Sequence, residues 1–267
     1  MKAKHIILSA LALIAATALT SSCNQLVDKA LQVAMEAVNH DYQDSEKWGK
    51  VTTVSIPALA FHEVELSGAV RLEYTQDSIY SIEVYGNEKA IEAYTITVDE
   101  GELEVTLKDG TEKVNSNTPA ITVRITAPYL SEIIGSGASE VLYMNSVEQQ
   151  EELEVNISGV GKFSLGELKI KELDMTINGA GEVQMDELCC TEDVEFKLSG
   201  AANIDGKIEC RKLKLKMSGA GNGKLDIYCQ QVRVSASGAA NVTLTGECHD
   251  YEAIATGSSS VNRDDLK

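Results

Sequence analysis

Proline, histidine and positive charge are scarce in this sequence, and each shortage excludes a class of structure or chemistry. The three prolines, Pro57, Pro119 and Pro128, all lie in the first half of the 267-residue chain. Proline cannot donate a hydrogen bond to a strand ladder, so a long proline-free region is typical of inner strands bonded on both sides. The four histidines are scattered, and none forms a recognisable serine–histidine–acid arrangement. The sequence also lacks a phosphate-binding loop and a dinucleotide fingerprint.

The charge balance is strongly negative. The chain has 23 lysines and arginines against 41 aspartates and glutamates, which gives a net charge of −18 at pH 7. This acidity disfavours binding to nucleic acid and electrostatic docking on an anionic membrane. We therefore expect no nucleic-acid partner.

A short glycine phrase recurs through the second half of the chain. Its glycines are 19 to 22 residues apart, and a fixed period near twenty indicates stacked repeats in which each unit packs on the next. An earlier copy occurs at Ser67-Gly68-Ala69. The seven regular copies are Ser136-Gly137-Ala138, Ser158-Gly159-Val160, Asn178-Gly179-Ala180, Ser199-Gly200-Ala201, Ser218-Gly219-Ala220, Ser237-Gly238-Ala239 and Thr256-Gly257-Ser258.

Within each unit, apolar residues alternate with polar ones, as in Leu213, Leu215 and Met217. A period of two indicates strands, and it predicts that one face of each strand is buried and the other is exposed to solvent. No segment of the repeats shows a sustained apolar stripe at helical spacing. We therefore expect an all-β fold. It is a right-handed, single-stranded parallel β-helix over residues 131–267, with coils of about 19–22 residues stacked about 4.8 Å apart.

Three asparagines, Asn203, Asn222 and Asn241, each follow their repeat glycine by three residues. Equal offsets predict a stacked polar ladder, because asparagine tolerates tight corners and bonds to its neighbours in a ladder. The ladder is either structural or part of a ligand-binding face.

Cysteines recur at the same period. Cys190, Cys210, Cys229 and Cys248 form one column, and Ile170 occupies the same place one coil earlier. An isoleucine in this column predicts that the column points inward as a small apolar stack. Neighbouring thiols are close enough for a disulfide, although parallel side chains strain one, so both the reduced and the bridged state remain open. A straight column does not surround a tetrahedral zinc ion, and Cys189 should face outward.

The N-terminus has the features of an export signal. Lys2 and Lys4 precede the apolar stretch from Ile6 to Leu19, which is too short for a comfortable membrane span. The small-residue run closing on Cys23 resembles a bacterial lipoprotein signal. The resemblance implies a signal peptide over residues 1–22, a lipidated Cys23 and an anchor in the outer membrane, on its periplasmic or its outer side. An ordinary secretory signal is the alternative.

Residues 23–50 form a tether with a short helix, because five apolar residues between 26 and 37 lie on one helical face. In residues 51–130, apolar and polar residues again alternate, but in runs of irregular length and spacing. Turn signals such as Glu100-Gly101 and Asp109-Gly110 separate these expected strands. We expect this part to be irregular β structure that caps the rod.

Three further segments run in a familiar order: Phe61 to Ala69, Glu100 to Leu103, and Thr126 to Leu130. Together with the Ser-Gly-Ala coils, they resemble the auto-transporter adhesin, head GIN domain family, which is common in Bacteroidetes-type lipoproteins. The resemblance covers residues from about 51 to the end and implies a β-helix-like fold. It carries no catalytic motif.

The hypothesis that these observations favour is a non-enzymatic cell-envelope lipoprotein without cofactor or metal. It displays a repeated polar face to a glycan or surface-protein ligand. One alternative is a polysaccharide-acting enzyme, for which the candidate acids are Asp186, Asp205, Asp226 and Glu247. A calcium site at Gly219 to Asp226 is disfavoured, because this segment lacks the nine-residue repeat of calcium-binding β-rolls. Another alternative is a structural subunit that forms homo-oligomers.

Overall fold

The computed structural model describes residues 45–108, 120–149 and 151–267. The signal peptide over residues 1–22, Cys23 and the apolar stripe between residues 26 and 37 lie outside the described residues. Among the described residues, no helix is long and apolar enough to cross a membrane.

The described chain is almost entirely β structure, and the all-β prediction is confirmed. The two helices, α3 (Ser45–Trp48) and α4 (Glu88–Glu92), are a single turn each. The strands are β1 (Val51–Ile56), β2 (Glu63–Gln76), β3 (Ser81–Asn87), β4 (Tyr94–Asp99), β5 (Glu102–Leu107), β6 (Ile121–Ala127), β7 (Glu132–Tyr143), β8 (Val147–Glu148), β9 (Glu152–Ser164), β10 (Glu167–Ile170), β11 (Glu172–Cys190), β12 (Asp193–Gly257) and β13 (Ser260–Leu266).

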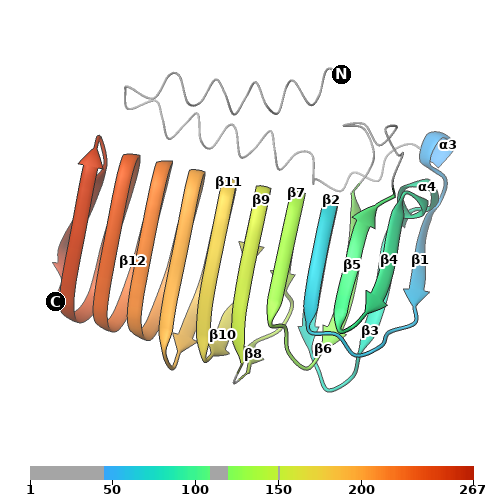
Figure 1. The fold of residues 1–267 in the computed structure, drawn as a ribbon, viewed down its shortest axis with the longest axis horizontal. Helices are drawn as coiled ribbons and strands as arrows, with labels where there is room; N and C mark the ends of the chain where they lie inside the picture. Colours follow the sequence, from blue (N-terminus) through green and yellow to red (C-terminus); the bar gives the residue numbers. More distant parts are fainter. Residues whose placement is uncertain (1–44, 109–119, 150) are drawn as a thin grey trace.

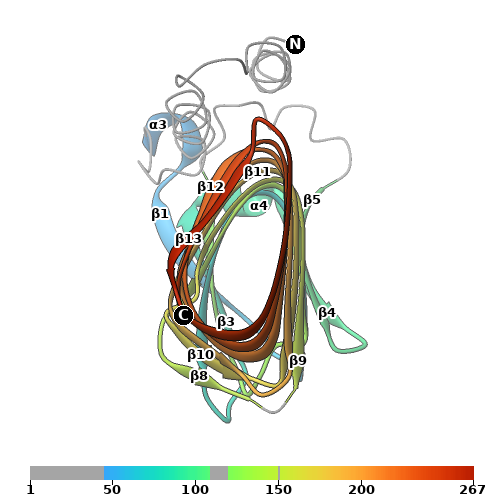
Figure 2. The same cartoon turned by 90° about the vertical axis from the view of Figure 1, so that its left-hand side faces the viewer.

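These strands belong to one 13-stranded sheet that does not close on itself. We call each repeat of 19 to 22 residues one lap. From β2 onward the laps pair in parallel and in register, in the order β2, β7, β9, β11, β12 and β13. Figure 1 shows the laps side by side along the long axis, and in Figure 2 they overlie one another around one shared outline. β12 runs unbroken for 65 residues because several successive laps are continuous strand.

The glycine phrase forms a corner that repeats in every lap. Gly68, Gly137, Gly159, Gly179 and Gly200 are paired in register, and each has positive φ. A Cβ atom on Gly179 would overlap the carbonyl oxygen of Gly159 directly beside it. Two constraints therefore require glycine here, namely a left-handed backbone and the close approach of the next lap.

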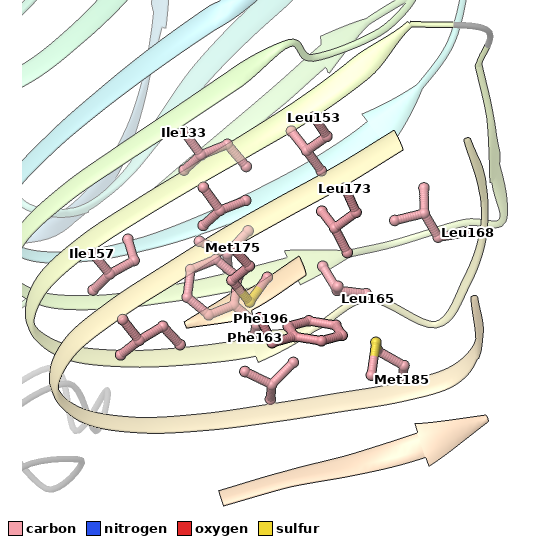
Figure 3. Close-up of a cluster of buried hydrophobic side chains, with 14 of the residues drawn as sticks. Ile133, Leu153, Ile157, Phe163, Leu165, Leu168, Leu173, Met175, Met185 and Phe196 are labelled. Carbon is pink, nitrogen blue, oxygen red and sulfur yellow. The ribbon is translucent and has the colours of Figure 1, made fainter. Parts of the chain in front are cut away.

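The interior of the laps is apolar. Figure 3 shows part of it, where Phe163 and Phe196 lie among Met175, Leu165 and Met185. Phe163, Met175 and Phe196 are completely buried. The alternating pattern of the sequence is reproduced along β12, in which buried and exposed residues alternate for most of its length. Burial of one face of most strands stabilises the stacked laps.

The N-terminal part departs from the regular stack, as the irregular pattern of residues 51–130 predicts. Antiparallel pairing joins β1 to β3, β3 to β6 and β4 to β5. At the other end of the described chain, no antiparallel strand pairs with the last lap. Val261 and Leu266 in the last lap are only partly buried, whereas Val242 and Leu244 one lap earlier are 1% exposed.

Candidate functional site

Each lap folds back on itself and so has two long outward sides (Figure 2). We assign the outward side chains of each lap by their position before or after the repeat glycine. We call the outward side chains of the strand that enters the corner the pre-glycine face. Those of the strand that leaves the corner form the post-glycine face.

The post-glycine face carries a continuous polar column at the third residue after each glycine. Its members, in order of the laps, are Arg71, Glu140, Lys162, Glu182, Asn203, Asn222, Asn241 and Ser260. The first four alternate in charge, with 2.7 Å between Arg71 Nη2 and Glu140 Oε2 and 3.8 Å between Lys162 Nζ and Glu182 Oε2. The later members are uncharged, so the column changes from ion pairs to hydrogen-bonding groups.

The structure places the three predicted asparagines in this column. The backbone N–H and the side-chain amide of Asn222 donate to Asn203 Oδ1 at 3.0 and 3.3 Å. Asn241 Oδ1 instead accepts a hydrogen bond from Ser260 Oγ at 2.8 Å. Asn203 and Asn222 are half-buried, but Asn241 is exposed.

The predicted cysteine column lines a groove of about 790 Å³ at the opposite end of the laps from the glycine corner. Cys190 pairs in register with Ile170, and Cys190, Cys210 and Cys229 are all at most 8% exposed. Cys248 is only partly buried, and its backbone N–H donates to the carbonyl oxygen of Lys267. All five described cysteines are free thiols.

Within this column, Cys210 Sγ and Cys229 Sγ are 3.1 Å apart and share a hydrogen bond. This bond raises the pKa of Cys210 and lowers the pKa of Cys229. Burial raises the pKa of Cys190 to about 12. Cys190 is therefore a protonated thiol at neutral pH.

The acids considered for an enzyme do not form one site. Asp205 lies opposite Gln184 in the register, and Asp226 accepts a hydrogen bond from Thr245 Oγ1 at 3.0 Å. Asp186 lies on the far side of a register shift from Asp205. In the described part of the chain, no group of three histidine, cysteine or acidic residues is placed to hold a metal ion.

The pre-glycine face carries charged side chains of both signs. Its N-terminal laps carry stacked glutamates, and register pairs Glu63 with both Glu102 and Glu132. Its later laps mix lysines with acids, and Lys214 Nζ lies 2.7 Å from Glu195 Oε1. Comparing outward residues at a fixed distance before each glycine shows this column of charges in the sequence.

Comparisons with known proteins identify the architecture. The family described as "Putative auto-transporter adhesin, head GIN domain" matches residues 60–207 and 190–267. No curated protein matches the chain.

Solved structures share the fold. A "putative adhesin" from Bacteroides fragilis superposes with a TM-score of 0.68 at 16% identity, covering 80% of this chain and 96% of its own. A "putative adhesin" from Parabacteroides merdae and a "putative lipid binding protein" from Parabacteroides distasonis each give a TM-score of 0.51, at 17% and 21% identity. Both cover 80% of this chain and 96% of their own length.

Proposed function

Because this chain belongs to the auto-transporter adhesin, head GIN domain family, we propose that it is a non-enzymatic adhesin of the cell envelope. Its post-glycine face binds an extended polar ligand, with a glycan as the first choice and a surface protein as the second. One observation carries the proposal: outward polar groups recur in register along the laps, about 4.8 Å apart. An extended chain of hydroxyl groups meets such a row at many points, so individually weak hydrogen bonds add up.

The uncharged part of the column is the part best suited to a glycan. Asn241 and Ser260 are exposed, and Asn262 and Thr243 lie beside them on the last two laps. Amide and hydroxyl groups both donate and accept hydrogen bonds, as sugar hydroxyls do. They can therefore bind a neutral glycan, in spite of the negative net charge of the chain.

We further propose that the laps wind as a right-handed, single-stranded parallel β-helix. Parallel register between laps of 19 to 22 residues supports it, as does the strong preference of parallel crossover connections for the right-handed sense. A crystal structure with left-handed laps would refute this part.

A lipid anchor at Cys23 completes the proposal, with residues 1–22 as the signal peptide. Cells fed a labelled fatty acid should label the wild-type protein, and Cys23→Ser should abolish the label, because the proposed lipid is attached through the thiol of that residue. Equal labelling of the two proteins would contradict the anchor.

The ligand-binding prediction is tested with the full-length protein on a glycan array, with lipid vesicles as a parallel arm. The double variant Asn241→Ala with Ser260→Ala should lose at least tenfold in affinity for whichever glycan the wild type binds. Both side chains are at the surface and bond mainly to each other, so the thermal midpoint should change little.

The matched control for this test is Ser235→Ala, an exposed change on the pre-glycine face, which should leave binding intact. Equal affinity in the double variant, or turnover of a polysaccharide by the wild type, would contradict the proposal. Binding to vesicles but to no glycan would favour a lipid role instead.

A further inference from the structure

Two thiols of the cysteine column touch each other across neighbouring laps. Cys210 Sγ and Cys229 Sγ are 3.1 Å apart, and the two residues are separated by 19 positions, which is one lap. If both side chains had the same rotamer, parallel in-register laps would hold the two sulfurs about 4.8 Å apart. The sulfurs therefore converge, and about 1 Å of further approach separates them from the length of a disulfide bond.

The backbone around this pair also has the spacing that a disulfide needs. A Cβ atom on Gly219 would overlap the carbonyl oxygen of Gly200, so these two laps are held in close register 19 residues apart. In-register strands about 4.8 Å apart lie within the range of Cα separations found in disulfides, about 4.4 to 6.8 Å. Side chains that point the same way strain the bond, and strain makes a disulfide easier to reduce. The geometry therefore favours a reversible disulfide over a permanent one.

Cys229 is the thiol of this column whose pKa is lowered. The hydrogen bond with Cys210 is the largest influence on it and acts against burial, and backbone hydrogen bonds from Cys210 and Tyr228 act in the same direction as the thiol. Burial instead raises the pKa of Cys190 to about 12, and burial also raises the pKa of Cys248. A thiolate is the form that attacks a disulfide, so Cys229 is the reactive member of the column.

The groove gives an oxidant a route to the pair. Cys210 and Cys229 are only 7% and 8% exposed, but both line the groove of about 790 Å³. Arg211 and Gln230, which directly follow them in the chain, line the same groove and are exposed. A small disulfide that enters the groove therefore reaches Cys229 without separation of the laps.

We propose that Cys210 and Cys229 are a site of reversible disulfide formation that joins two neighbouring laps, with a disulfide compound as the oxidant. The Cys229 thiolate attacks one sulfur of the oxidant, forms a mixed disulfide with it and expels the other sulfur as a thiolate. The Cys210 thiol then loses its proton to solvent, attacks the Cys229 sulfur and expels the second thiolate. Two protein thiols are oxidised, and one disulfide of the oxidant is reduced to two thiols. The site lies away from the post-glycine face, so it does not depend on the ligand-binding proposal.

The test uses the purified full-length chain with Cys23→Ser, which prevents lipidation, and Cys189→Ser, which removes the partly exposed thiol outside the column. This parent protein retains the four cysteines of the column. Treating the reduced parent with oxidised glutathione should lower the number of free thiols from four to two, and dithiothreitol should restore all four.

Peptide mapping identifies the partners. Trypsin cuts after lysine and arginine, so Cys210 and Cys229 fall in separate peptides, residues 208–211 and 225–233. Mass spectrometry without a reductant should find these two peptides linked in the oxidised parent. Cys190 and Cys248 fall in other peptides and should remain free.

Single substitutions separate the roles of the two thiols. In Cys210→Ala the reaction should stop at the mixed disulfide, so glutathione should remain on peptide 225–233. In Cys229→Ala the thiol of Cys210 should be lost at least tenfold more slowly than in the parent, because the thiolate that attacks first is gone. Cys190→Ala is the matched control, a buried thiol of the same column whose removal should change neither the linkage nor its rate. Circular dichroism melts confirm that each variant is folded, and the mapping of the parent needs no variant at these positions.

Three outcomes would overturn the proposal. The first is a parent protein that keeps all four thiols under oxidised glutathione. The second is a predominant link between another pair, such as Cys190 with Cys210 or Cys229 with Cys248. The third is the same predominant Cys210–Cys229 link when the reaction is run in concentrated urea. Neighbouring cysteines of the column are 19 or 20 residues apart, so an unfolded chain should link them about equally, and a preference there would not come from the folded laps.

Discussion

Replacing Gly179 with alanine is expected to lower the free energy of unfolding by about 4 kcal/mol or more, or to prevent folding. Gly179 has φ of 139°, where a side chain is strained. The new Cβ atom would also overlap the carbonyl oxygen of Gly159 in the neighbouring lap. Gly179 and Gly159 are held side by side by the parallel ladder, so relief requires pulling two laps apart. Equilibrium unfolding in urea measures the loss.

Gly166→Ala is the matched control for this change. Gly166 also has positive φ, at 56°, but a Cβ atom there would meet nothing within 4 Å. The control therefore isolates the backbone cost of a left-handed alanine, which is about 1 kcal/mol. Equal losses at the two positions would mean that the lap-to-lap contact at the corner does not govern stability.

The glycine column is also the part of the fold that the sequence predicts best. Positive φ and close backbone approach both exclude side chains. Glycine is therefore required at the same place in every lap, and its period is visible in the sequence. The same arithmetic predicts columns of asparagines and cysteines, and in the structure Asn222 donates a hydrogen bond to Asn203 Oδ1 of the lap before it. A constraint that repeats in every lap can be recognised from the sequence alone.

The ends of the stack could not be predicted this way, because burial there depends on whether another lap follows. Cys248 occupies the same place in its lap as Cys229, yet it is only partly buried, because Lys267 is the residue paired with it on its far side. Antiparallel pairing of β1 with β3 likewise depends on contacts between segments about 30 residues apart, and it follows no repeat.

The charged column of the pre-glycine face could not be predicted for a different reason. Glu132, Glu154 and Lys214 occupy matching places in their laps but differ in sign. A search for identical residues passes over them, and only the register shows that they lie in one column.

Phe196→Ala is expected to cost about 4 kcal/mol of unfolding free energy, the second largest effect among the changes considered. Phe196 is completely buried and pairs in register with Met175 of the lap before it (Figure 3). In a stack, each lap is stabilised only by its immediate neighbours, so a cavity in the middle weakens two interfaces at once. Urea unfolding should lose cooperativity as well as stability, because the laps on the two sides of the cavity become less coupled.

Ile254→Ala is the control for this loss, since Ile254 is a large apolar residue that is 55% exposed on the last described laps. Its truncation should change the unfolding free energy by less than about 0.5 kcal/mol. A small effect at Phe196, comparable with that at Ile254, would mean that the middle laps relax to fill the space. The stack would then be held together mainly by its backbone ladders, and the shared apolar interior would contribute far less than its burial indicates.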